Sequence, residues 1–369
     1  MRLNRNFTVI FVGTALACGG DDLEPKVVTQ YSAIVEANYA DALAKATALD
    51  VAIKAFTAAP SAATLAAAKT AWNAARTPYV QSEAYRFYDG PIDDAVTGPE
   101  GRINAWPMDE VFIDYVAGSS VSAGIIGGTE PITRALLVSK NEQGGEKNIA
   151  TGFHAIEFLL WGQDFDVAGP GQRPFTDYTT ELNAARRKTY LETVSALLVA
   201  DLTQVHDAWA PGAAYPTALS AGSTNDALQK ILTGMGSLSG AELSGERMTV
   251  ALDNRDQEDE HSCFSDTTHL DILNDAISVQ NVWFGKYGSN DGPGIDELVT
   301  AKDADLSARV TASMAASITA IQAIPAPFDQ AIVSEAGRVK VKAAIDALKA
   351  ETNLIAEVAT TLGVTLNLE

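Results

Sequence analysis

Apolar residues recur every three or four positions along most of this chain. Between residues 178 and 209 one stripe with that spacing contains Leu191, Val194, Leu198, Leu202, Val205 and Trp209. A stripe near the C-terminus contains Val341, Ile345, Leu348, Ile355, Val358 and Leu362. This spacing is the repeat of an amphipathic α-helix, whereas a half-buried strand would show strict alternation. The pattern therefore predicts an all-α protein with no sheet larger than a hairpin.

Clusters of glycine, proline and polar residues divide the apolar pattern into separate helices. We expect helices at residues 31–58, 61–87, 108–116, 132–138, 147–161, 178–209, 225–234, 240–260, 267–287, 304–324 and 339–362. Short connections between so many helices predict two four-helix-bundle-like domains packed side by side. We place the first bundle at 26–175 and the second at 176–369, although the helix at 178–209 could join either bundle.

The first 17 residues have the features of a secretory signal peptide. Arg2 and Arg5 precede an apolar run at 7–16, which is shorter than the roughly 20 residues that a transmembrane helix needs. Cys18 follows a small residue, as in a bacterial lipobox. We therefore expect a lipid on Cys18, a tether at 18–25, and a protein of the periplasm or cell surface that is anchored to the outer membrane. Ordinary cleavage with a free thiol is the alternative.

The composition narrows the range of functions. Asp and Glu number 47 against 26 Lys and Arg, giving a net charge of -21, which argues against nucleic acid and anionic membrane surfaces as partners. Two cysteines, Cys18 and Cys263, give no disulfide framework, so the core must supply stability. The chain has no nucleophile elbow and no phosphate-binding glycine loop, which disfavours nucleophilic and nucleotide chemistry.

His154 and Glu157 are the first candidates for a functional site. Their spacing of three places them on one helix face, about 5–6 Å apart at Cβ. They could bind one cation together, or the acid could orient the imidazole. An intrahelical hydrogen bond is the structural alternative. The neighbouring residues indicate a buried helix, in which charge needs a partner or a metal: Phe158, Leu159, Leu160 and Trp161.

Two further clusters contain residues that could complete such a site. Glu258 and His261 have the Glu-x-x-His spacing of di-iron helical bundles. Asp266 lies three residues before His269, and its structural alternative is a cap on the next helix. In the other cluster, helical spacings of seven and three separate Arg76, Glu83 and Arg86. An arginine beside a buried carboxylate would keep that carboxylate ionised, whereas a solvated ion pair is the alternative.

The Gly152-x-His154-x-x-Glu157 motif resembles the G-x-H-x-x-E hallmark of the imelysin-like superfamily. Segments 71–79, 83–87 and 102–110 also look like segments of that family, and 258–269 is similar to its iron-regulated protein A branch. The resemblance covers nearly the whole mature chain. It implies a two-bundle all-α fold with a functional site between the bundles, in exported proteins associated with bacterial iron uptake. The superfamily also carries a peptidase label.

These observations lead us to expect a protein that binds iron, or zinc or another divalent metal, as an ion or an iron chelate. His154, Glu157 and Glu83 are the expected ligands, and an iron-transport partner is expected. The residues expected to line the site are Arg76, Arg86, Trp106, Glu258, His261, Asp266 and His269. A metallopeptidase using His154 and Glu157 is one alternative, although no second histidine or spare glutamate stands beside them. A non-catalytic surface scaffold is the other.

Overall fold

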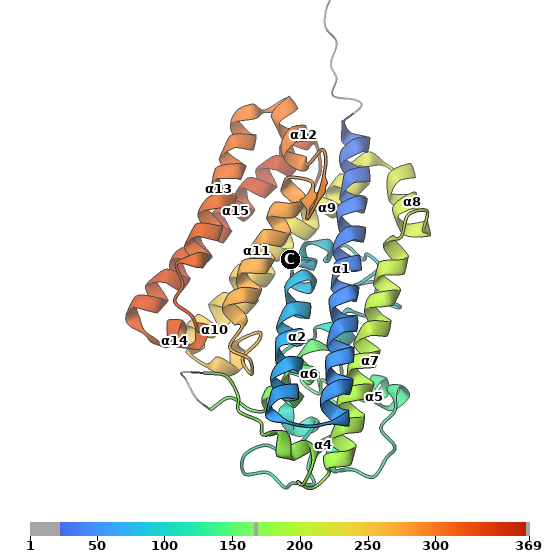
Figure 1. Cartoon of the computed structure of the whole chain (residues 1–369). Helices are drawn as coiled ribbons and strands as arrows, with labels where there is room; N and C mark the ends of the chain where they lie inside the picture. Colours follow the sequence, from blue (N-terminus) through green and yellow to red (C-terminus); the bar gives the residue numbers. More distant parts are fainter. Residues whose placement is uncertain (1–22, 166–168, 367–369) are drawn as a thin grey trace, which may run out of the picture.

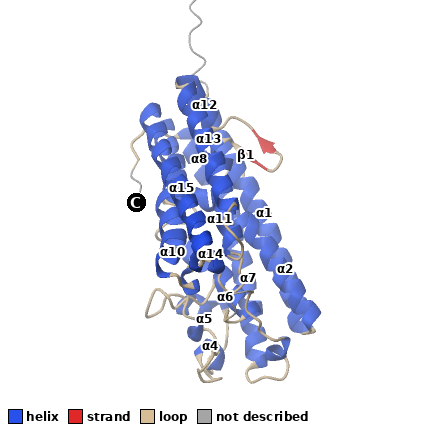
Figure 2. Ribbon diagram, turned by 90° about the vertical axis from the view of Figure 1, so that its left-hand side faces the viewer, coloured by secondary structure: helices blue, strands red, loops and turns tan. Residues whose placement is uncertain are grey.

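The computed structural model describes residues 23–165 and 169–366, and nearly all of its regular structure is helical (Figure 1). The expected all-α fold is thus confirmed. Within the described residues the strands form one antiparallel hairpin of β1 (Lys286–Tyr287) and β2 (Asn290–Asp291), seen in red in Figure 2. None of the helices in these ranges is long and apolar enough to cross a membrane.

The helices vary widely in length. The long ones are α1 (Glu24–Ala58), α2 (Ala62–Val80), α6 (Gly152–Trp161), α7 (Ala184–Trp209), α9 (Thr224–Ser237), α11 (Thr268–Trp283), α13 (Ala304–Gln322) and α15 (Glu335–Leu362). The short α-helices are α3 (Glu100–Ile103), α4 (Gly124–Gly127), α5 (Arg134–Lys140), α8 (Ala214–Ala221), α10 (Val250–Asn254), α12 (Ile295–Lys302) and α14 (Phe328–Val333). Single 3-10 turns are η1 (Glu83–Tyr85), η2 (Glu110–Phe112), η3 (Phe175–Tyr178) and η5 (Gln257–Asp259). A π-helix, η4 (Leu238–Thr249), joins α9 to α10.

The long helices form two bundles that lie side by side in Figure 1. In one bundle α1 packs on α2 and α7, and α6 packs on α2 and α7. In the other, α15 packs on α13 and η4, and α11 packs on α13 and η4. The bundles meet where α2 and η1 contact α11. Helix α7 packs on the first bundle although it follows residue 175; the domain boundary itself stays a prediction.

Several expected helices differ in extent from those of the structure. The helix expected at 61–87 ends at Val80, the one expected at 147–161 begins at Gly152, and the one expected at 178–209 begins at Ala184. The helix expected at 108–116 is only the turn η2, because the Asp109 side chain accepts a hydrogen bond from the Val111 backbone and the Asp109 N–H bonds to the Lys147 carbonyl. The helix expected at 240–260 ends at Asn254, where Arg255 takes a left-handed φ of 56°. The following loop, 255–267, turns back toward the first bundle. Helix α1 also begins inside the expected tether, with Pro25 in its first turn, a position that proline favours.

One carboxyl group lies inside the second bundle. Glu351 of α15 is 2 % exposed, and its carboxyl accepts a hydrogen bond from the Ser239 hydroxyl of η4 at 3.3 Å. The Ser317 hydroxyl of α13 bonds to the same group. Burial outweighs these bonds and raises the pKa of Glu351 to about 7. This acid is therefore partly protonated at neutral pH, because desolvation penalises its charged form.

Candidate functional site

Gly152 positions the helix that carries the His-x-x-Glu pair. Its φ is +84°, a conformation that other residues rarely adopt, and a Cβ here would overlap the Ile103 carbonyl. The absence of a side chain lets the loop after α3 pass directly against the start of α6. That loop carries Asn104 and Trp106. The glycine of the motif therefore has a structural purpose: it lets this loop bring Trp106 next to His154.

His154 and Glu157 form a fully buried pair on α6. The His154 Nδ1 lies 3.0 Å from Glu157 Oε2, and neither residue is exposed. The other oxygen, Oε1, accepts hydrogen bonds from Ser265, at 3.0 Å from the backbone N–H and 2.7 Å from the hydroxyl. Among the described residues the His154 Nε2 has no hydrogen-bond partner. Both carboxylate oxygens are thus engaged, whereas one imidazole nitrogen is not.

The electrostatics of this pair favour its neutral form. Burial raises the pKa of Glu157 to about 8, and the hydrogen bonds from Ser265 only partly oppose that rise. Burial, followed by the positive charge of Arg76, holds the pKa of His154 well below its ordinary value. A neutral imidazole has one nitrogen lone pair, which lies on Nε2 in the tautomer whose Nδ1–H donates to Glu157 Oε2. His154 can therefore act as an acceptor or a metal ligand.

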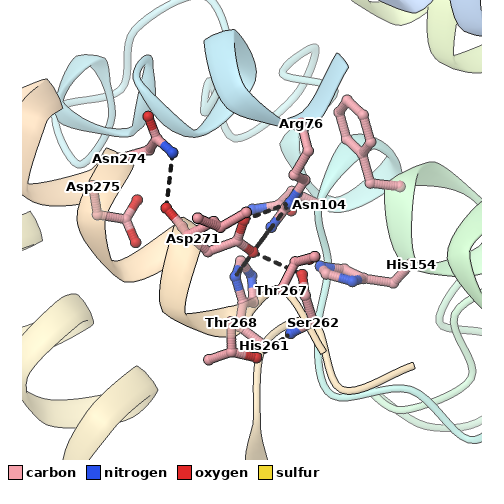
Figure 3. A network of polar contacts seen from close by, with 12 residues as sticks. Arg76, Asn104, His154, His261, Ser262, Thr267, Thr268, Asp271, Asn274 and Asp275 are labelled. Carbon is pink, nitrogen blue, oxygen red and sulfur yellow. Dashed lines mark hydrogen bonds and ion pairs between the residues drawn. The ribbon is translucent and has the colours of Figure 1, made fainter. Parts of the chain in front are cut away.

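The loop 255–267 places His261 against His154. The two rings lie 4.8 Å apart between centroids, and Figure 3 shows His261 beside Arg76 and Asp271. The Arg76 Nη2 lies 3.0 Å from His261 Nδ1 and 2.9 Å from Asp271 Oδ2. Because a guanidinium can only donate, Nδ1 accepts and a neutral His261 carries its proton on Nε2. His261 therefore presents an N–H donor.

Glu83 lies on the other side of Asn104, among arginines. Its Oε2 lies 2.6 Å from Arg86 Nη1 and 2.7 Å from Arg247 Nη2. The Asn104 amide donates to Oε1 at 3.3 Å and its carbonyl accepts from Arg76. Burial alone would raise the pKa of Glu83, but Arg86 and Arg247 outweigh burial and lower it. Glu83 is therefore an ionised counter-ion for the arginines.

A cavity of about 440 Å³ opens onto this network between the bundles. Its size lies within the range of small-molecule sites. His261 and Trp106 line its inner part together with two arginines, and several carboxylates lie around them. The lining residues are Arg86, Glu100, Gly101, Asn104, Ala105, Trp106, Pro107, Glu142, Glu242, Glu246, Arg247, Val250, Asp259 and His261.

The structure brings some of the expected site residues together and leaves others apart. Contacts link five of them: His154 contacts Glu157, Trp106 and His261, and His261 in turn contacts Arg76. Residues 23–165 and 169–366 contain no group of three His, Cys, Asp or Glu side chains that could hold a metal ion. The three expected ligands therefore do not converge on one point as a metal site would require: His154, Glu157 and Glu83.

Among the described residues Glu258 and His269 make no hydrogen bond to His154, Glu157 or Glu83, and Asp266 precedes α11. Glu258 lies among carboxylates, and burial, followed by Glu110, raises its pKa to about 7. Asp266 has a left-handed φ of 57°, and Thr267, not Asp266, occupies the N-cap position of α11. The ring of His269 is bonded to the Asp266 backbone. Cys18 and the expected signal peptide lie outside the described residues.

Sequence reasoning missed the second-bundle partners of the site. Arg247 bonds to Glu83 and, at 2.8 Å, to Asp275. Asp271 holds Arg76, and Ser265 holds Glu157. Asp271 and Asp275 are one turn apart on α11 and face two buried arginines. Their spacing in the sequence is the signal that could have identified them. Ser265 carries no such signal.

Comparisons with known proteins agree with this architecture. A family model described as Imelysin matches residues 35–355. Iron-regulated protein A of Synechococcus elongatus is 25% identical over 334 residues, covering 87% of this chain and 82% of that protein. A crystal structure described as an iron-regulated protein A precursor from Parabacteroides distasonis has a TM-score of 0.70 at 20% identity, covering 93% and 97% of the two chains. An imelysin-like protein from Psychrobacter arcticum has a TM-score of 0.69 at 15% identity, covering 94% and 98%. The chain belongs to the imelysin family.

Proposed function

We propose that this protein binds iron as a cargo, in the form of a chelate with oxygen donors. His154 Nε2 is the nitrogen that would enter the coordination sphere of the iron. The observation that carries the proposal is the state of that ring: Nδ1 is held by Glu157 while the buried Nε2 has no partner within the described residues. Histidines that ligate metals typically use one nitrogen in this way, with a carboxylate on the other.

A chelate fits the site better than a bare ion does. A bare ion needs several protein ligands, and the described residues offer no group of three. A chelate brings most of its own ligands, and its oxygen atoms need hydrogen-bond donors. Arg86, Arg247 and His261 line the 440 Å³ cavity and are donors of this kind. One protein nitrogen would then bind the iron, and the surrounding N–H groups would donate hydrogen bonds to the oxygen atoms of the chelator.

Iron is preferred over other metals for two reasons. Imidazole with oxygen donors suits iron, and the Synechococcus relative carries the name iron-regulated protein A.

Binding is favoured over peptide hydrolysis, despite the peptidase label in the family name. Hydrolysis needs a base next to an activated water. Glu157 is the obvious base, but Ser265 engages one of its oxygens and His154 engages the other. We therefore expect no peptide cleavage above a blank. Robust cleavage that is lost in Glu157→Ala without loss of metal would restore the peptidase alternative.

We also propose that the protein works outside the cytoplasm, attached to the outer membrane through a lipid on Cys18. The motivation is the leader at 1–17, whose apolar run ends just before Ala17 and Cys18. Mass spectrometry of the mature N-terminal peptide tests this proposal. A lipid-modified Cys18 at the N-terminus is the expected result, and an unmodified thiol would contradict the anchor.

Iron binding is tested on protein without a histidine tag, which would add ligands. Ferric citrate is incubated with the protein, the excess is removed by gel filtration, and bound iron is counted by elemental analysis. We expect one iron per chain and a loss of affinity of at least about tenfold in His154→Ala, because a coordinated nitrogen disappears. His206→Ala is the matched control, since His206 lies at the surface near Glu36. Equal binding by the two variants would refute the proposal.

A further inference from the structure

The cavity stops short of the nitrogen that the proposed function requires. Trp106 and His261 both line the cavity, whereas His154 does not, and His154 is 0 % exposed. The Trp106 ring lies 4.9 Å from the His154 ring between centroids, and the His261 ring lies 4.8 Å away. These two side chains therefore separate His154 from the cavity. One of them must move before a ligand can reach Nε2.

Hydrogen bonding decides which of the two side chains can move. His261 is held through Nδ1 by Arg76, and Arg76 is in turn fixed by Asp271 (Figure 3). Displacing the His261 ring would break bonds inside a buried charge network, which is costly. Trp106 is different, because its Nε1 has no hydrogen-bond partner in the part of the chain that the structure describes.

Packing alone therefore holds the indole of Trp106. Besides His154, its ring contacts Phe264 edge-on at 5.8 Å between centroids. Trp106 is only half-buried, and one side of it faces the cavity, so a turned ring has space to occupy. An outward rotation would also bring its unpartnered N–H into the cavity, where an oxygen atom of a ligand could accept it.

We propose that Trp106 is the gate of the site: rotation of its indole opens the path from the cavity to His154, and its return closes the path. The closed gate keeps water from the His154–Glu157 pair. Its role in ligand entry rests on the function proposed above, but the barrier itself does not. A ligand held beneath the closed indole would leave slowly, because the ring must move again before release.

The gate is tested with diethyl pyrocarbonate, which acylates neutral imidazoles and requires no metal. Peptide mass spectrometry follows His154, with the surface residue His206 as the internal reference. In the natural protein we expect slow modification of His154 relative to His206. Trp106→Ala should raise the His154 rate about tenfold, since reaction follows the fraction of time that the site is open. Trp106→Phe, which keeps a ring against Phe264, should give an intermediate rate.

Val250→Ala is the matched control. Val250, at the start of α10, lines the same cavity from the second bundle and has no ring contact with His154. This variant therefore enlarges the cavity without removing the indole, and the His154 rate should stay unchanged. Circular dichroism and an unchanged His206 rate verify folding. Fast modification of His154 in the natural protein, or an unchanged rate in both folded Trp106 variants, would refute the gate. A raised His154 rate without ferric citrate binding in any variant would uphold the gate and refute the proposed iron chelate.

Discussion

Replacing Glu351 with glutamine tests the electrostatics of the second bundle. The folded protein raises the pKa of this acid from 4.5 to about 7, so the folded state binds a proton more tightly than the unfolded chain does. Stability therefore falls as the pH rises through this range. Below pH 4.5 the burial of Glu351 does not lower the free energy of unfolding through its charge, because the carboxyl is protonated in both the folded and the unfolded state. Above pH 7 the full cost applies, and a shift of this size corresponds to about 3 kcal/mol.

Glutamine keeps the shape and the hydrogen bond from Ser239 but carries no charge. Glu351→Gln should therefore match the natural protein near pH 4.5 and exceed its free energy of unfolding by about 3 kcal/mol near pH 8. Urea unfolding followed by circular dichroism at both pH values measures the difference. Glu357→Gln is the control on the same helix: Glu357 is exposed and paired with Arg309, so its removal should give no gain at high pH. If the advantage of Glu351→Gln does not grow with pH, the Glu351 carboxyl is stabilised as an anion and the reasoning fails.

Two other substitutions test the packing around the site. Gly152→Ala should lower the free energy of unfolding by about 1–3 kcal/mol. The loss should exceed that of Gly118→Ala, because Gly118 has a similar φ of +81° but open space around it. Equal losses in thermal unfolding would show that the overlap with the Ile103 carbonyl does not matter. Arg247→Met should cost about 3–5 kcal/mol, since it leaves the buried Asp275 without a cation and Glu83 with Arg86 alone. A loss below about 1 kcal/mol in urea unfolding would mean that Asp275 is protonated or hydrated instead.

The long helices were predictable because their apolar residues repeat locally. The stripe that ends at Trp209 and the stripe that ends at Leu362 each lie in one helix of the structure. The short helices α8, α12 and α14 were missed, since one or two turns contain too few residues to show a period. The π-helix η4 was expected as an ordinary helix, because its altered register depends on packing against α15 and not on its own sequence.

The site was predictable only where its residues are close in the sequence. The His154–Glu157 pair is a local feature of α6, so the spacing was enough to find it. The surroundings of Glu83 are different, because its partner Arg247 lies 164 residues further along the chain. With only its local neighbour Arg86 in view, Glu83 looks like an ionised carboxylate that could still ligate a metal. Contacts between the bundles change its role to that of a counter-ion.

The charge pairing between the bundles has a consequence for how the protein unfolds. Arg76 of the first bundle is neutralised by Asp271 of the second, and Glu83 of the first by Arg247 of the second. Separating the bundles would leave these charges in apolar surroundings or require them all to be hydrated at once. Neither bundle is therefore an independent folding unit around this interface, and a fragment that contains only one of them should be insoluble or incompletely folded. Heating should melt both bundles in one cooperative transition.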